Sequence, residues 1–363
     1  MQRDSLAKTY FLYLIILVIL VIFRILTACN VLNFFGDAGD YIFTIAVQIF
    51  VLFGLSIFGF AKLNKKSIKQ VLNGYGFQKI SFKSVFLCLL IGIVIYFLNS
   101  YIATFFYELL SLFGYSISGS PVPKEYPFYL LIINLIFTAV LPGICEETVH
   151  RGMLFSEMKK KSVIFAIVMS SLLFGLLHIN IYQFFYASIL GVILAILTLS
   201  TQSIFPAMIV HFMNNALNVY FVFAHVNNLF SAKVVNFLFS SVSTNSTFGF
   251  SFYLLFFLFL LFALYVLYVE LVKETAKKRV QKFQNSFGKF LARKIYFEEL
   301  DKMKNGEKLS NEYAIEENDI SIFFGQKQEK NDKKHSFYSK LFLFGAIFLS
   351  SLTTLFTFIW GII

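Results

Sequence analysis

Long runs of apolar residues recur along the chain, and short polar or charged stretches separate them. A helix needs about 20 predominantly apolar residues to cross roughly 30 Å of hydrocarbon. The pattern predicts nine such spans, the fifth to seventh being short, at residues 10–27, 41–60, 84–105, 127–148, 163–179, 182–200, 204–224, 250–270 and 341–361. We expect an all-α polytopic membrane protein of about eight to nine transmembrane helices, because a β-barrel would show short alternating segments instead.

The composition excludes other protein classes. Of 363 residues, 58% are hydrophobic and only 14% are charged, with a mean hydropathy of +0.74. Soluble domains carry roughly 25% charged and 45–50% apolar residues, so this chain could not hide its apolar surface in a water-soluble core. With 19 Gly, 5 Pro and 3 Cys, collagen-like and disulfide-rich classes are excluded as well.

The basic residues predict the orientation in the membrane. With the N-terminus in the cytosol, all but four of the 31 Lys and Arg residues fall on the cytosolic side. Lys124 and Lys233 lie outside, while Arg24 and Arg151 fall within spans. The positive-inside rule therefore predicts a multi-pass protein of the cell membrane with a cytosolic N-terminus. The net charge of +11 then requires no nucleic acid, and anionic lipids at the inner leaflet are the expected partner.

One long polar stretch, residues 272–340, interrupts the spans. Its first part is basic, and Phe283, Phe287 and Phe290 recur at three- and four-residue steps, which predicts an amphipathic helix on the inner leaflet. Residues 298–319 are mainly acidic. We expect a cytosolic helical or partly disordered segment here, and a surface that recruits a partner is the alternative.

Ionisable side chains within spans are costly, and each is a candidate functional group. Glu147 and Arg151 are four residues apart, so they share a helix face and can form an ion pair. Glu146 points about 100° away from Glu147 and is left outside that pair. A partly desolvated carboxylate of this kind is a candidate general base, and a structural charge network at the membrane edge is the alternative.

Two later spans carry histidines. His178 lies at the end of the fifth predicted span, and His211 begins a polar stripe with Asn214, Asn215 and Asn218 on the seventh. In lipid such a stripe must face other helices or water, so it lines the interior of the bundle. A free carboxylate, two imidazoles and an amide are the groups needed to attack a peptide carbonyl with activated water.

These residues form an ordered set of motifs that resembles the CAAX protease and bacteriocin-processing (CPBP) family of intramembrane proteases. The resemblance covers about residues 127–222 and implies a helical bundle with a conical active-site cavity open to the cytosol. The motifs are, in order, Glu146-Glu147-x-x-x-Arg151, Phe174-x-x-x-His178 and His211-x-x-x-Asn215.

The resemblance also implies roles for these residues. Glu146 would activate water together with His178, while His211 and Asn215 would form an oxyanion hole. The second glutamate and the arginine of the first motif would hold the site in shape. The family is commonly described as metalloproteases, so a divalent metal such as zinc, held by Glu146, His178 and His211, remains open. His150 occupies a variable position of the first motif.

The expected function is an endopeptidase acting on a membrane-associated peptide or protein, as in CAAX-type processing, bacteriocin or pheromone leader processing, or bacteriocin self-immunity. An ion-coupled transporter with Glu146, His178 and His211 as a relay is one alternative. A non-catalytic membrane scaffold that binds a partner through residues 272–340 is the other. The expected domains are N-terminal helices 1–126, a catalytic membrane core 127–224, an eighth helix 225–271, the charged segment 272–340 and a C-terminal helix 341–363.

Overall fold

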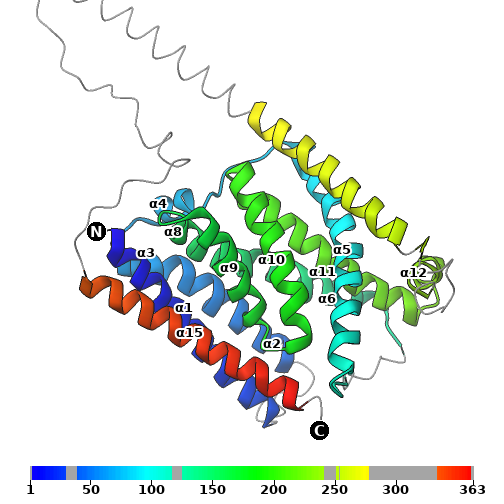
Figure 1. Ribbon diagram of the computed structural model, residues 1–363, viewed down its shortest axis with the longest axis horizontal. Helices are drawn as coiled ribbons and strands as arrows, with labels where there is room; N and C mark the ends of the chain where they lie inside the picture. The colour runs from blue at the N-terminus through cyan, green and yellow to red at the C-terminus, as the bar shows by residue number, and fades with distance from the viewer. Residues whose placement is uncertain are drawn as a thin grey trace, which may run out of the picture.

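The computed structural model describes residues 2–29, 39–116, 125–240, 251–252, 254–277 and 333–360, and every regular element in them is a helix (Figure 1). Eight helices are long and apolar enough to cross a membrane: Ser5–Ala28, Tyr41–Asn64, Phe82–Ser111, Phe128–Met158, Ile181–Thr201, Phe205–Val226, Leu254–Lys277 and Phe337–Trp360. The chain is therefore a multi-pass α-helical membrane protein, which confirms the fold class predicted from hydropathy.

Several of these spans consist of consecutive α-helical and π-helical segments. The first half of the described chain contains α1 (Gln2–Ala28), α2 (Gly39–Ile45), η2 (Ala46–Gly59), α3 (Phe60–Asn64), α4 (Ile68–Gly74) and α5 (Phe82–Ser111). The fourth span contains α6 (Phe128–Asn134), η3 (Leu135–Val140), α7 (Leu141–Glu147), η4 (Thr148–Phe155) and α8 (Ser156–Met158). The helices that follow are α9 (Val163–Leu177), α10 (Ile181–Thr201), α11 (Phe205–Val226), α12 (Phe230–Ser240), the Leu254–Lys277 helix and α15 (Lys333–Trp360).

The structure differs from the predicted spans in three places. The predicted fifth span is α9, whose 15 residues extend only about 22 Å, too short to cross the hydrocarbon. The third span continues to Ser111, so the apolar stretch after residue 105 extends that helix. The fourth runs on to Met158, because its charged residues lie in the middle of the helix and do not mark its end.

The polar segment 272–340 is described only at its two ends. The predicted amphipathic helix, beyond its first turn, and the acidic stretch 298–319 lie outside the described residues. Their structures, and the domain boundaries drawn around them, stay predictions.

Long π-helical segments were not anticipated from the sequence. The segments η2, η3 and η4 are π-helical, and η4 begins directly after Glu147. Such segments are rare, and they often occur at functional sites because they shift the direction of the following side chains. Hydrophobic periodicity gives no signal for them, since an extra residue per turn leaves an apolar helix apolar.

Two glycines bring the helices of the central bundle into close contact. A Cβ added at Gly143 of α7 would lie 3.2 Å from backbone atoms of α11, Met208 O and Phe212 N. A Cβ added at Gly191 of α10 would lie 3.0 Å from Ser171 Cα of α9. Both distances are tighter than ordinary contacts, so a larger residue would push the helices apart. The close approach puts α7, α9, α10 and α11 around one centre.

The segment between α4 and α5 fixes the start of α11. Gly76, at φ +81°, accepts a hydrogen bond from Ile204 N at 2.9 Å, and Ser203 Oγ donates to Gln78 O at 2.7 Å. Tyr75 donates to Ser56 O at 2.6 Å, and burial raises the pKa of its hydroxyl well above the ordinary value. These bonds attach the segment between α4 and α5 to η2 on one side and to α11 on the other.

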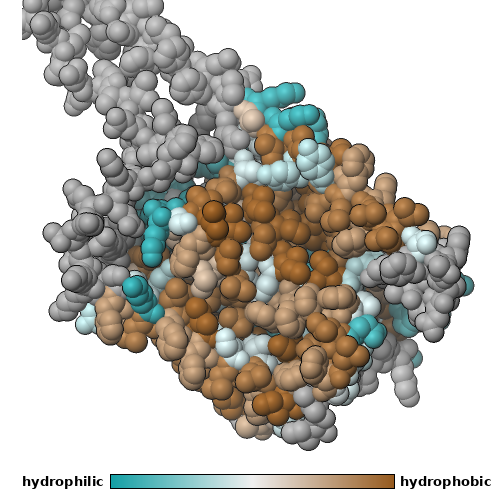
Figure 2. All heavy atoms as spheres, viewed as in Figure 1, coloured by the Kyte–Doolittle hydropathy of each residue, from teal (hydrophilic) through white to brown (hydrophobic). Residues whose placement is uncertain are grey.

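The first and last helices of the described chain, α1 and α15, pack side by side along one flank of the bundle (Figure 1). Figure 2 shows a face dominated by apolar side chains. Its hydrophilic side chains gather mainly along the edge where α4, α8 and the end of the Leu254–Lys277 helix lie. This distribution is that of a protein whose sides contact lipid and whose charged edge contacts water.

Candidate active site

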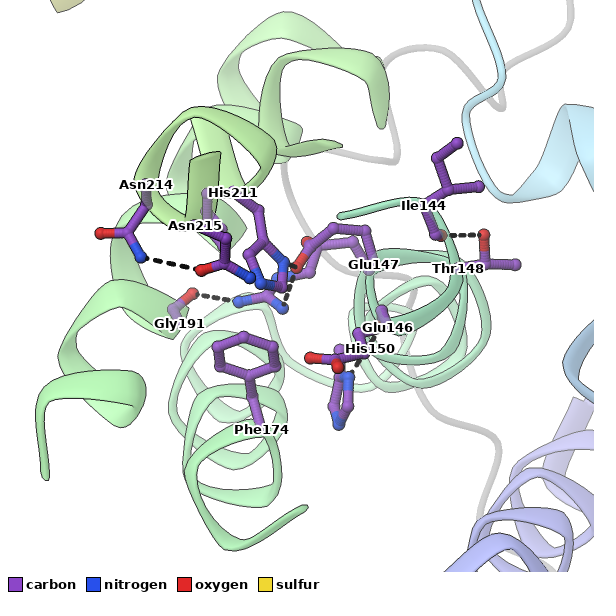
Figure 3. Close-up of polar contacts among 12 residues, drawn as sticks. Ile144, Glu146, Glu147, Thr148, His150, Phe174, Gly191, His211, Asn214 and Asn215 are labelled. Atoms are coloured by element: carbon purple, nitrogen blue, oxygen red, sulfur yellow. Dashed lines mark hydrogen bonds and ion pairs between the residues drawn. The ribbon is translucent and has the colours of Figure 1, made fainter. Parts of the chain in front are cut away.

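A buried ion-pair network occupies the centre of the bundle (Figure 3). Glu147 Oε1 accepts hydrogen bonds from Arg151 Nη1 at 3.0 Å and from His211 Nδ1 at 2.9 Å. Arg151 Nη2 donates to Gly191 O at 2.9 Å. Glu147 and Arg151 are fully buried, and His211 is 2% exposed. We call these four residues the buried network; it joins α7 and η4 to α10 and α11.

Phe174 packs at the centre of the site and brings the three motifs together. The edges or faces of three imidazoles lie around its ring, with centroid distances of 5.1 Å to His150, 5.2 Å to His178 and 5.4 Å to His211. The guanidinium of Arg151 lies over the ring at 4.5 Å, a cation–π contact. One aromatic side chain of α9 therefore contacts groups from η4, α11 and its own helix end.

His178 sits on a tight turn between α9 and α10. Its Nδ1 lies 2.9 Å from Phe174 O, so this nitrogen carries the proton that is donated and Nε2 is left as an acceptor. Ile179 follows at φ +48°, a strained conformation for a β-branched residue. Asn180 then caps α10 by accepting a hydrogen bond from Gln183 N at 3.1 Å. The turn thus fixes both the backbone and the ring of His178.

The C-terminal helix supports the same turn. Ile181 N, the first residue of α10, donates to Thr357 Oγ1 of α15 at 3.0 Å. A helix that lies far away in the sequence therefore satisfies a free backbone N–H three residues after His178.

Glu146 stands outside the buried network and is half-buried. Its Oε1 accepts a hydrogen bond from Gln48 Nε2 of η2 at 3.2 Å, while its Oε2 is shielded from solvent and has no hydrogen-bond partner. His150 Nδ1 donates to the backbone oxygen of Glu146 at 2.8 Å. The charges of Glu146 and His178 are close enough to interact. One carboxylate oxygen is therefore held, and the other can take a proton.

Asn215 is held by a chain of amides. Its Nδ2 donates to Thr138 O at 3.2 Å, and its Oδ1 accepts from Asn214 Nδ2 at 3.0 Å. Asn214 in turn accepts from Asn99 Nδ2 of α5 at 3.3 Å. An amide nitrogen has two hydrogens, so one hydrogen of Asn215 remains for another acceptor.

The structure brings most of the predicted site residues together. The polar stripe of α11 divides, because Asn214 and Asn215 join the site whereas Asn218 lines a separate cavity of ≈ 260 Å³ with Tyr96, Phe221 and His225. The six residues predicted to be catalytic all lie in or beside the centre around Phe174: Glu146, Glu147, Arg151, His178, His211 and Asn215.

The predicted metal ligands do not form a metal-binding set. Among the described residues, no group of three His, Cys, Asp or Glu side chains is placed to hold an ion. His211 directs Nδ1 at Glu147, and His178 directs Nδ1 at its own helix, so each ring could offer a metal only its Nε2.

Sequence reasoning missed two residues of the site. Gln48 is a lone amide in the apolar second span, where a neutral side chain is a weaker signal than an ionisable one. His150 was assigned to a variable position, yet it is fully buried, contacts Phe174 and has an Nε2 without a partner. Rare polar residues of any kind within a span were the available signal.

Comparison with protein-family models gives a match over residues 128–217 to the family described as type II CAAX prenyl endopeptidase Rce1-like. The match begins at the start of α6 and ends within α11, so it contains all three motifs. It supports an intramembrane endopeptidase of the CAAX type in general. No match was found among curated proteins or among solved structures.

Proposed function

We propose that this multi-pass membrane protein, whose residues 128–217 form an Rce1-like domain, hydrolyses a peptide bond of a membrane-associated peptide or protein. The observation that carries the proposal is the state of Glu146. It has one oxygen held by Gln48 and the other without a partner, and it interacts electrostatically with His178, whose Nε2 is an acceptor. A carboxylate with a free oxygen and a nearby acceptor nitrogen are suited to activate a water molecule.

In the first step Glu146 acts as general base. Its Oε2 takes a proton from water as the water oxygen bonds to the carbonyl carbon, so one O–H bond breaks and one C–O bond forms. His178 Nε2 accepts the second hydrogen bond of the same water and orients it. A tetrahedral intermediate results, with a negative charge on the former carbonyl oxygen.

Asn215 and His211 stabilise that oxyanion. Asn215 donates its remaining amide hydrogen. His211 has Nδ1 engaged with Glu147, so Nε2 can donate only when the ring is protonated. The buried carboxylate of Glu147 holds the ring of His211 in its orientation, as an aspartate does in hydrolases that use a Ser-His-Asp triad. Arg151 holds Glu147 in place for this role.

In the second step the intermediate collapses. The C–N bond breaks, and the proton that Glu146 received passes to the leaving nitrogen, which departs as an amine. Glu146 is again ionised, and the new carboxyl group leaves the site and gives its hydroxyl proton to bulk water. Water is the only co-substrate of the reaction.

The position of Glu146 limits the substrate class. Glu146 lies twelve residues before Met158, the end of the fourth span, and so at most about 18 Å along the helix from that end. A scissile bond must therefore enter the bilayer, which favours a lipid-anchored or membrane-inserted peptide over a soluble one. Substrates of this kind are CAAX-type proteins, bacteriocin or pheromone precursors, and, in self-immunity, a bacteriocin that acts on the producing cell.

The charge distribution supports the orientation. With the N-terminus in the cytosol, Met158 and Lys159 face the inner leaflet, so the proposed site opens to the cytosol of the cell membrane. The basic residues that follow Leu254–Lys277 would meet anionic lipids there.

The test uses the full chain reconstituted in vesicles with a farnesylated CAAX peptide, the same peptide without lipid, and a bacteriocin leader peptide on a lipid tether. We expect the wild type to cleave at least one lipidated peptide, and Glu146→Ala to abolish cleavage. Glu108→Ala, which changes an exposed glutamate of α5, is the matched control and should cleave normally. Equal cleavage by wild type and Glu146→Ala, or none by wild type, would overturn the proposal.

A further inference from the structure

We infer that Gln48 of η2 is a positioning residue that fixes the catalytic carboxylate of Glu146, an inference that rests on the proposed function. Gln48 lies outside residues 128–217, the region that matches a known family. The second span would thus supply part of the active site, although none of the sequence motifs extends to it.

The contact itself is well defined. Gln48 is 8% exposed, and its Nε2 donates to Glu146 Oε1 at 3.2 Å. The helix that carries it packs directly against α7 and η4, the segments on either side of the two glutamates. The bond is therefore made between a buried amide and a half-buried carboxylate on two helices that pack together.

The other end of the amide makes no bond that could add stability. Gln48 Oε1 is buried and has no hydrogen-bond partner. A buried amide oxygen without a donor costs free energy, whereas an apolar side chain of the same length would fill the space without that cost. The amide of Gln48 has two polar atoms. Only the nitrogen has a hydrogen-bond partner, and that partner is Glu146.

Glu146 needs such a partner because of its own flexibility. The last torsion of a glutamate is broad and roughly two-fold, so an unheld carboxylate exchanges its two oxygens. A donor on Oε1 selects one orientation and leaves Oε2 for the water.

The experiment compares three variants with the wild type in the cleavage assay and in thermal unfolding. Gln48→Met keeps the length and removes the donor, while Gln48→His returns a ring N–H at similar reach. Ser56→Ala removes a buried hydroxyl from the same helix, one that bonds to its own backbone, and is the matched control. All are measured as full chains in vesicles with the lipidated peptide that the wild type cleaves.

For Gln48→Met we expect kcat to fall about 10- to 100-fold with KM unchanged, because only the orientation of the base is lost. Its midpoint of unfolding should equal or exceed that of the wild type. Gln48→His should recover part of kcat, and Ser56→Ala should resemble the wild type. A wild-type kcat for Gln48→Met would overturn the inference. A loss shared equally by Gln48→His and accompanied by a lower unfolding midpoint would also overturn it.

Glu146→Ala separates this inference from the proposed function. If Glu146→Ala is inactive and Gln48→Met is fully active, only the positioning role fails. If Glu146→Ala is fully active, or the wild type cleaves no peptide, the proposed function fails first. Infrared difference spectra of wild type and Glu146→Gln supply a readout without substrate. The carboxylate band assigned in this way should shift in Gln48→Met, and an unchanged band would contradict the contact.

Discussion

The site has two halves that differ in their exposure. The buried network around Glu147 is sealed, and its carboxylate carries two hydrogen-bond donors on one oxygen. Glu146, His178 and Asn215, which we call the open group, are half-buried, and each keeps an atom available for a further hydrogen bond. Glu147 Oε2 and Arg151 Nε also have no hydrogen-bond partner among the described residues, so the two halves differ in exposure: the sealed residues are out of reach of a substrate, whereas the half-buried ones can meet it.

Glu146 and Glu147 are adjacent on one helix, yet their carboxylates have different roles. Glu146 and Glu147 point in different directions, and only Glu147 meets the arginine four residues later. Removing one partner of a buried ion pair leaves an uncompensated charge, which is a large stability effect. Removing a general base leaves the packing intact and changes the rate. The following changes are chosen to break or sharpen this contrast.

The largest effect is expected for Arg151→Ala. It leaves the fully buried Glu147 facing only His211, and we expect a loss of about 3–5 kcal/mol in the free energy of unfolding, with no activity remaining. Chemical denaturation in detergent, followed by circular dichroism, measures it. The double change Glu147→Leu with Arg151→Leu should regain much of the stability and none of the activity. A stable Arg151→Ala protein would show that the network does not hold the site.

His178→Ala tests the open group. It removes the acceptor nitrogen beside Glu146 and should lower kcat by about 10²- to 10³-fold. The ring's hydrogen bond to Phe174 O is local to one helix end, so the midpoint of unfolding should change little. Cleavage assays and thermal unfolding of the same preparation give both values. A collapse of stability would place His178 with the buried network instead.

Gly143→Ala tests the distance between α7 and α11, two helices that each carry residues of both halves. A Cβ there would lie 3.2 Å from α11 backbone, so α11 must move and carry His211 and Asn215 with it. We expect about a 10-fold loss of kcat and a cost of about 1–3 kcal/mol. Alanine at Gly74, where a Cβ meets nothing within 4 Å, is the matched control. Equal behaviour of the two variants would contradict the close packing.

The smallest effect is expected at the turn after His178. Ile179→Asn replaces a β-branched residue at φ +48° by one that tolerates this conformation, and we expect a gain of about 1 kcal/mol in stability. Cleavage should stay within about twofold of the wild type, since the His178 ring is held by its own helix. A clear loss of stability would show that the packing of Ile179 outweighs its strain.

Much of this arrangement was predictable from local sequence. The apolar runs predicted the membrane helices, and the four-residue step between Glu147 and Arg151 predicted their ion pair, because both depend on neighbours along one helix. The length of α9 and the extension of the fourth span to Met158 were wrong in the prediction. In the sequence, polar residues in the middle of a span cannot be distinguished from polar residues at the end of a span.

Contacts between distant helices were beyond the sequence. The bond from Gln48 to Glu146 joins residues 98 positions apart, and the bond from Ile181 to Thr357 joins residues 176 apart. Neither pairing follows from spacing on one helix, since it depends on which helices pack together and at what height. The π-helical turn after Glu147 likewise depends on that packing.

The central claim is that neighbouring glutamates divide catalysis and structure between them. The most direct measurement is the rate of peptide cleavage and the unfolding midpoint of Glu146→Gln and Glu147→Gln, prepared side by side. The account predicts that Glu146→Gln unfolds like the wild type and does not cleave, whereas Glu147→Gln has a clearly lower midpoint. Cleavage at the wild-type rate by Glu146→Gln would contradict it.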